Sequence, residues 1–86
     1  MGIKETINHG NKKYGIGDGR FWVFDHQGNN LYQFPIKQVH YTIGRNVISE
    51  QVSEFTVFLP NGEEVRFVES DKLTFFVDAF VLESSL

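Results

Sequence analysis

Apolar and polar residues alternate through the middle of the chain, and this period of two predicts a series of antiparallel β-strands. Residues 20–25, "RFWVFD", place Phe21 and Val23 on one face of such a strand, and Trp22 and Phe24 on the other. Aromatic and β-branched side chains of this kind favour strands. The predicted strands are residues 20–25, 31–36, 38–44, 54–59 and 63–69.

Turn residues separate these strands. Residues 25–30, "DHQGNN", predict a hairpin loop, because glycine and asparagine tolerate a positive φ angle. Residues 60–62, "PNG", predict a tight turn between the last two strands. Pro35 cannot donate a backbone hydrogen bond, so its strand is expected at a sheet edge or to carry a bulge.

Two segments leave alternatives open. Residues 45–53, "RNVISEQVS", form either a loop or a short strand around Val47 and Ile48. Residues 1–12, "MGIKETINHGNK", are polar apart from Ile3, Ile7 and the initial methionine. These twelve residues form either a short first strand or a loose N-terminal arm of a single domain that spans residues 1–86.

The period changes to that of a helix over residues 70–86. Ser70 is the expected N-cap, and Asp71 would place a negative charge in the first turn, where the helix dipole favours it. Apolar residues then recur at i, i+3, i+4 and i+7, which predicts a core-facing stripe. This stripe consists of Leu73, Phe76, Val77, Phe80 and Val81.

The same helix carries a second apolar face, on nearly the opposite side, made of Phe75, Ala79, Leu82 and Leu86. A helix that only covers a sheet needs one apolar stripe. An exposed apolar patch usually marks an interaction surface, so these four residues are the predicted partner interface. The alternatives are that the N-terminal arm covers this face or that the last helical turn frays.

Composition narrows the class of protein. The chain has 86 residues, which is the size of one domain, and nine Phe, three Tyr and one Trp provide a dense core. It has no cysteine, which excludes disulfides and thiolate metal sites. No signal peptide and no apolar run of membrane-spanning length is visible. We therefore expect a soluble, cytoplasmic protein.

Charge is distributed unevenly about a net value of −3. Residues 1–45 carry six Lys/Arg and three Asp/Glu, whereas residues 46–86 carry two and eight. Such a split favours head-to-tail contacts or a local basic patch on an acidic body, although a mixed solvated surface is the simpler interpretation.

The stretch "YGIGDGRFWVF", residues 14–24, is the nearest approach to a chemical motif. A dinucleotide-binding loop needs G-x-G-x-x-G before a helix, whereas here the spacing is G-x-G-x-G before a strand. The glycines therefore predict a turn, a bulge or a coiled strand. The alternative is a backbone nest that binds an anion beside Lys12, Lys13 and Arg20.

No catalytic, metal or cofactor site is predicted. His9, His26 and His40 are not spaced as metal ligands, and the serines lie in no nucleophile motif. Aromatic side chains could stack on the bases of single-stranded nucleic acid while basic side chains neutralise its phosphates, although the acidic net charge of the protein opposes such binding. That candidate anion or nucleic-acid patch consists of Lys12, Lys13, Arg20, Trp22 and Lys37.

The order of elements resembles the pleckstrin-homology-like fold in its short bacterial versions. The resemblance rests on "DGRFWVFDHQGNNLYQFPIKQVHYTIG", "EFTVFLPNGEEVRFVES" and "DKLTFFVDAF" and covers roughly residues 20–80. It implies an α+β, mostly β fold: a bent antiparallel sheet or partly open barrel of about five to seven strands, capped by one C-terminal helix. Members bind phosphoinositides, peptides or proteins, or only oligomerise, and no binding residue is transferred from them.

The order of elements also resembles the subunit of dimeric coactivators that bind single-stranded DNA, whose strands precede a helix. The favoured function is a non-enzymatic protein-interaction or oligomerisation module that binds itself or another protein. The alternative is a single-stranded nucleic-acid-binding protein. No cofactor is expected in either case.

Overall fold

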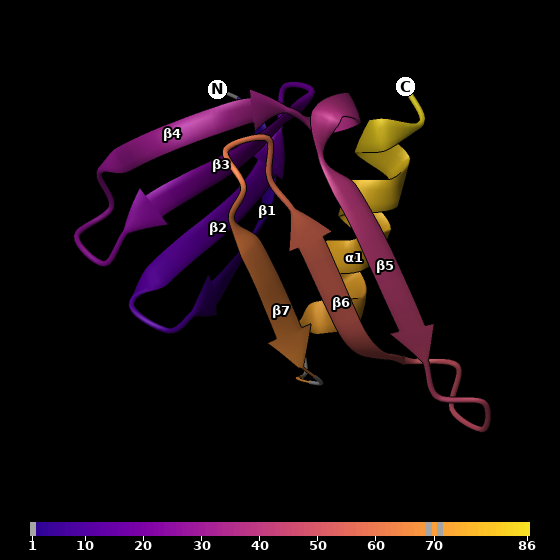
Figure 1. The fold of residues 1–86 in the computed structure, drawn as a ribbon. Coiled ribbons are helices and arrows are strands. Elements are labelled where there is room, and N and C mark those ends of the chain that lie inside the picture. The colour runs from indigo at the N-terminus through magenta and orange to yellow at the C-terminus, as the bar shows by residue number, and fades with distance from the viewer. Residues whose placement is uncertain (1, 69, 71) are drawn as a thin grey trace.

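The computed structural model describes residues 2–68, 70 and 72–86. Seven strands and a short 3₁₀ helix precede one α-helix (Figure 1). The elements are β1 (Ile3–His9), β2 (Lys12–Gly17), β3 (Arg20–Asp25), β4 (Asn30–Pro35), η1 (Ile36–Gln38), β5 (His40–Arg45), β6 (Val52–Phe58), β7 (Glu64–Val68) and α1 (Leu73–Ser84).

The strands form two antiparallel sheets in chain order, β1-β2-β3-β4 and β5-β6-β7. Turns and loops of two to six residues connect the strands within each sheet, and η1 leads from one sheet to the other. Pro35 ends β4, which is an edge strand, as predicted. The predicted α+β, mostly β fold with one C-terminal helix is confirmed. In the described residues the strands form two separate sheets and no closed barrel.

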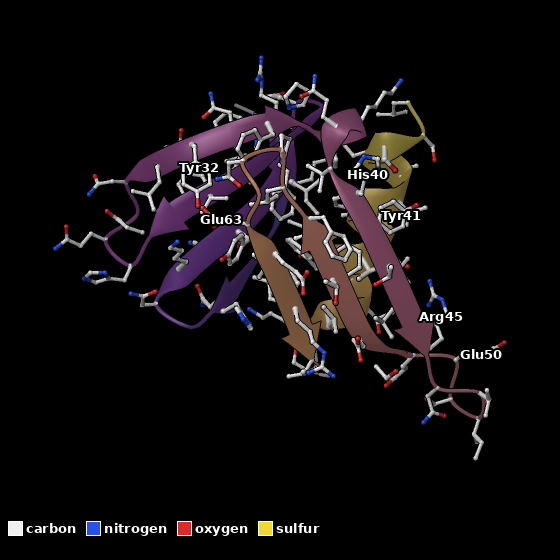
Figure 2. All side chains as sticks on the ribbon, viewed as in Figure 1. Tyr32, His40, Tyr41, Arg45, Glu50 and Glu63 are labelled. Carbon is white, nitrogen blue, oxygen red and sulfur yellow. The ribbon has the colours of Figure 1, made fainter. Side chains whose placement is uncertain are left out.

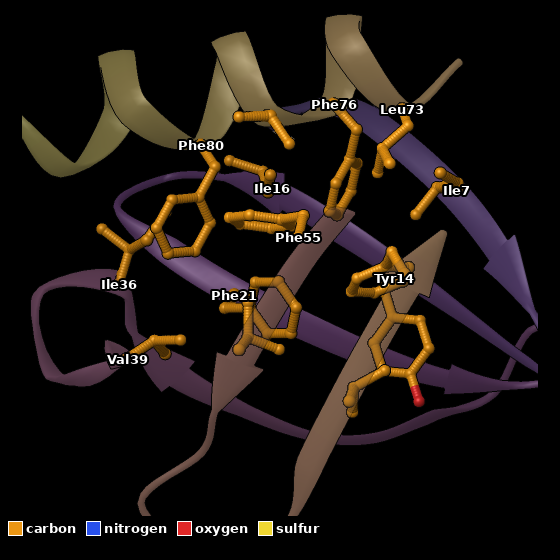
Figure 3. Close-up of a cluster of buried hydrophobic side chains, with 14 of the residues drawn as sticks. Ile7, Tyr14, Ile16, Phe21, Ile36, Val39, Phe55, Leu73, Phe76 and Phe80 are labelled. Atoms are coloured by element: carbon orange, nitrogen blue, oxygen red, sulfur yellow. The ribbon is translucent and has the colours of Figure 1, made fainter. Parts of the chain in front are cut away.

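A single core lies between α1 and the two sheets (Figure 3). Phe76 and Phe80 project from the helix onto Phe21 and Phe55, with ring centroids 5.3–6.4 Å apart and the rings close to perpendicular. Edge-to-face contacts of this kind add to the stability that apolar burial provides. The predicted core stripe is confirmed: Leu73, Phe76, Val77 and Phe80 are fully buried and Val81 packs against them.

The N-terminal residues form a strand. Ile3–His9 pair with β2 in antiparallel register, and Ile7 is buried against the core. Of the two alternatives for this segment, the structure therefore has the first strand and not the loose arm. Backbone pairing along β2 is the physical reason, because it satisfies the polar groups that a loose arm would leave to water.

The helix begins later than predicted. Lys72 occupies the N-cap position without a side-chain cap, and the Ser70 carbonyl only accepts a hydrogen bond from the Leu73 N–H. The prediction of Ser70 as N-cap is wrong, because the helical backbone begins only at Leu73, the first described residue after β7 that is buried in the core. Asp71 lies outside the described residues.

The glycine-rich stretch forms the β2–β3 hairpin. Asp18 and Gly19 have φ angles of 55° and 70°, so they form the two-residue turn with positive φ that matches the twist of paired strands. The predicted turn is confirmed. The Gly19 N–H donates a hydrogen bond of 2.8 Å to the Glu83 carboxylate. This turn therefore binds a carboxylate of the same chain, that of Glu83.

Candidate interaction surface

The outer face of α1 carries three of the predicted interface residues, and the structure leaves it open. The helix ends at Ser84, so the fourth, Leu86, lies just beyond it. Phe75, Leu82 and Leu86 are 66%, 60% and 68% exposed, and Ala79 between them is half-buried. Phe75 and Leu82 are seven residues apart, which is about 10 Å along a helix. Among the described residues, these side chains form an apolar strip facing away from both sheets.

The described N-terminal residues, from Gly2 onward, do not cover this strip. Strand β1 packs against α1 on its flank, where the Lys4 ammonium lies 3.1 Å from Glu83 Oε1. The described N-terminal residues are held in the sheet by pairing with β2. The alternative that the N-terminal arm folds over the outer face is therefore wrong for these residues.

Glu83 holds the helix to the first sheet. Its Oε2 accepts the hydrogen bond from Gly19, while Oε1 has the Lys4 ammonium nearby but no hydrogen bond of good geometry. The side chain is only 6% exposed. The Lys4 ammonium, followed by the Gly19 N–H, lowers the pKa of Glu83 below its ordinary value. Glu83 therefore fixes the rotation of α1, which directs Phe75 and Leu82 to solvent.

Glu83→Gln should lower the free energy of unfolding at pH 7 by about 1–2 kcal/mol, because the exposed Lys4 loses its partner and Gly19 loses a charged acceptor. A carboxylate whose pKa is lowered by folding stabilises above its unfolded pKa, and this contribution disappears as pH falls through the folded pKa. The difference between wild type and variant, measured by urea unfolding, should therefore shrink from pH 7 to below pH 4.

Glu54→Gln is the control for this experiment. Glu54 pairs with Arg66 at 2.9 Å, but both side chains are largely exposed. We expect the change to leave the free energy of unfolding almost unaltered, as is usual for surface ion pairs. Equal effects of the two substitutions would contradict the anchoring role of Glu83.

The tip of the β5–β6 hairpin is a second exposed apolar feature. Val47 and Ile48 are 93% and 91% exposed, the highest values of the exposed large hydrophobic residues. Residues 46–51 therefore form a loop, which decides between the two alternatives left open by the sequence. The hairpin projects away from the body of the protein (Figure 1). We call Val47 and Ile48 the hairpin tip.

Hydrogen bonds hold the hairpin tip in one shape. Asn46 Oδ1 accepts from the N–H groups of Ile48 and Ser49 at 2.9 and 3.0 Å, and the Asn46 carbonyl accepts from Glu50 N–H at 2.8 Å. The Asn46 N–H donates to the Gln51 carbonyl at 2.9 Å. Asparagine commonly forms such turns through its side chain. In the sequence, Asn46 ahead of two β-branched residues was therefore the signal that could have predicted this loop.

Arg45 and Glu50 flank the base of this hairpin (Figure 2). Both side chains are exposed, and an Arg45 guanidinium nitrogen donates to the Glu50 carbonyl at 3.3 Å. The tip therefore presents two apolar side chains between one positive and one negative residue. The outer face of α1 likewise has apolar side chains between one positive and one negative residue, since Lys72 and Asp78 are exposed on its opposite flanks.

The predicted anion or nucleic-acid patch is divided in space. Lys12 and Lys13 begin β2, whereas Arg20 pairs with Gly17 at the other end of that strand, about 17 Å away for a strand of this length. Lys37 lies in η1, which begins directly after Pro35. Pro35 pairs with Arg20, so Lys37 and Arg20 lie at the same end of the first sheet. The structure thus forms two pairs of cations rather than one cluster.

Trp22 lies between these two pairs, on the outer face of the first sheet. Its ring is parallel to that of Phe24, with 7° between the planes and 6.2 Å between the centroids. The indole N–H is already used, because it donates to the Gly17 carbonyl at 2.9 Å. Both side chains are half-buried, so the two parallel rings form a partly exposed aromatic surface with few free polar groups.

The remaining titratable groups of interest are two tyrosines near Glu63. Among the described residues, no group of three His, Asp or Glu side chains is placed to hold a metal ion. Tyr32 donates a hydrogen bond to Glu63 across the two sheets (Figure 2). Burial, followed by the Glu63 carboxylate, raises the pKa of Tyr32 to about 12, and the same two causes raise the pKa of Tyr14. Both phenols therefore stay protonated near neutral pH, and the Tyr32 hydrogen bond joins the first sheet to the β6–β7 turn.

Within the described part of the chain, no helix is long and apolar enough to cross a membrane. No protein-family model, curated protein or solved structure matches this chain. The chemistry of the outer helix face and the hairpin tip must therefore be understood from their own geometry.

Proposed function

We propose that this chain is a non-enzymatic interaction module that associates with further copies of itself through the outer face of α1. The observation that carries the proposal is the exposure of Phe75 and Leu82 on a helix whose core-facing side is buried; Leu86 is also exposed, just after the helix ends at Ser84. Monomeric proteins seldom leave such a patch open unless it meets a partner.

The rigidity of the helix supports this function. Glu83 ties α1 to the turn at Gly19, and the core stripe holds its whole length against both sheets. Side chains on a fixed helix lose little conformational freedom on binding, which favours association. The pleckstrin-homology-like resemblance of the sequence also supports this proposal, because members of that fold include proteins that only oligomerise.

The nucleic-acid alternative has weaker support. Its four cations lie in two separated pairs, and Trp22 has its polar group already bonded to Gly17. Affinity for nucleic acid rises with the number of phosphates neutralised at once, which two distant pairs on an acidic protein do not favour.

Phe75→Glu or Leu82→Glu should abolish self-association and leave the fold intact, because both side chains are exposed and a carboxylate cannot be buried in an apolar contact. Light scattering on a sizing column across a concentration series measures the mass, and circular dichroism measures the fold. Wild type should exceed the 9.9 kDa of one chain, while each variant should remain at that mass.

Gln33→Glu is the matched control, since it introduces the same charge at an exposed position of β4, outside the apolar face of α1. It should retain association. A wild type that remains monomeric at every concentration, or variants that associate as wild type does, would exclude this function.

A further inference from the structure

We infer that the partner of the outer helix face is the hairpin tip of a second copy, so that the chain assembles head to tail; this inference rests on the proposed function. Among the described residues, the hairpin tip and the outer face of α1 are the two surfaces with several strongly exposed, adjacent apolar side chains. One is a projecting knob and the other an open strip, so the two are complementary in shape.

The tip is built for insertion. Val47 and Ile48 are almost fully exposed, yet Asn46 fixes their backbone through four hydrogen bonds. Branched side chains on a fixed turn have little conformational freedom to lose when they become buried. The hairpin extends away from the rest of the protein (Figure 1), which makes its tip accessible to another molecule.

Charges on the two surfaces match in a head-to-tail contact. Arg45 and Glu50 flank the tip, and Asp78 and Lys72 flank the outer helix face. Seating the tip across the strip can place Arg45 beside Asp78, and Glu50 beside Lys72. Opposite charges at the rim of an apolar contact set its register and orientation.

A symmetric pairing of two α1 helices lacks this match. Phe75, Ala79 and Leu82 follow the spacing of a coiled-coil seam, and Asp78 is the exposed charge on one of its flanks. In an antiparallel pair each flank meets the same flank of the partner, so Asp78 would face a second Asp78, and like charges oppose association. In a parallel pair Asp78 would face the flank of Glu83, whose buried carboxylate already binds Gly19 and Lys4. Symmetric pairing therefore offers Asp78 no opposite charge, whereas the hairpin tip offers Arg45.

A head-to-tail contact leaves one tip and one helix face free at each end, so assembly continues into rings or open chains. The contact is small, because two tip residues and three strip residues cover less than the roughly 800 Å² per partner of a standard interface. Association should therefore be weak and depend strongly on protein concentration.

Complementation between two variants tests the inference. The tip variant carries Val47→Asp and Ile48→Asp, and the face variant carries Phe75→Glu and Leu82→Glu. All four positions are exposed, so both variants should fold, which circular dichroism can verify. Each variant alone should have the mass of one chain. Their equimolar mixture should contain a species of two chains and nothing larger, since one intact tip and one intact face remain.

Charge exchange provides a second test at the rim. Arg45→Glu alone and Asp78→Arg alone should each weaken association of the wild-type assembly by at least about threefold, and the double variant should recover it. Failure of the double variant to recover association would contradict the assigned orientation.

The outcomes separate the two proposals. If the tip variant associates as wild type does, the helix faces pair with each other and only the present inference fails. If wild type is monomeric at all concentrations, both proposals fail. If wild type is monomeric but sediments with vesicles of phosphatidylcholine and phosphatidylserine, and the tip variant does not, the tip binds membranes and the inference is overturned.

Discussion

Phe76→Ala should lower the free energy of unfolding by about 3–5 kcal/mol, which is the usual cost of removing a buried aromatic ring. Phe76 is fully buried, and its ring contacts those of Phe21, Phe55 and Phe67 from both sheets. Its removal leaves a cavity at the junction of all three layers. Because a domain of this size has a total stability of roughly 4–13 kcal/mol, the loss is a large fraction. Urea unfolding monitored by circular dichroism measures it.

Phe75→Ala is the matched control, one residue earlier in the same helix. Phe75 is 66% exposed, so the same truncation should change stability by less than about 0.5 kcal/mol in the monomer. Alanine also favours helix slightly more than phenylalanine does. Comparable losses at the two positions would mean that the rotation of α1 described above is wrong. Measuring at low protein concentration keeps self-association from adding stability to Phe75.

Gly17→Ala should destabilise the protein by about 2–3 kcal/mol, at the upper end of the cost of forcing extra atoms into a packed site. A Cβ atom at residue 17 would lie 1.9 Å from the Gly2 carbonyl oxygen and 2.4 Å from the Ile3 Cα. These are backbone atoms and cannot rotate away. The start of β1 must therefore separate from β2. Hydrogen exchange should show faster exchange at the Ile3 amide, and urea unfolding should show the loss.

Gly15→Ala distinguishes this close approach from a general requirement for glycine in β2. A Cβ atom at residue 15 would meet only side-chain atoms, of Ile3 and Phe24 at 3.4 Å and of Thr6 at 3.5 Å. These side chains can shift by a few tenths of an ångström, so we expect a change of less than about 1 kcal/mol. Equal destabilisation by both substitutions would argue against the contact between Gly17 and the Gly2–Ile3 backbone.

Local sequence patterns determined most of the fold. The period of two predicted the strands β3 to β7, and the turn residues predicted the β3–β4 and β6–β7 hairpins, because strand alternation and positive φ angles depend on near neighbours. Strands β1 and β2, with few apolar residues or many glycines, were left among alternatives. The two faces of the helix followed from its period alone, which identified the buried Phe76 and the exposed Phe75. The start of the helix at Leu73 was missed, because Ser70 is a favourable cap only where the chain already turns into a helix.

Only the tertiary structure decided the features that join distant segments. Gly19 and Glu83 are 64 residues apart, and their hydrogen bond exists because β1, β2 and α1 meet at one end of the core. The separation of Lys12 from Arg20 follows from their places at opposite ends of β2. The exposure of Val47 and Ile48 follows from the absence of any described element beside the projecting hairpin. Contacts across the chain depend on how sheets and helix pack, which no local pattern encodes.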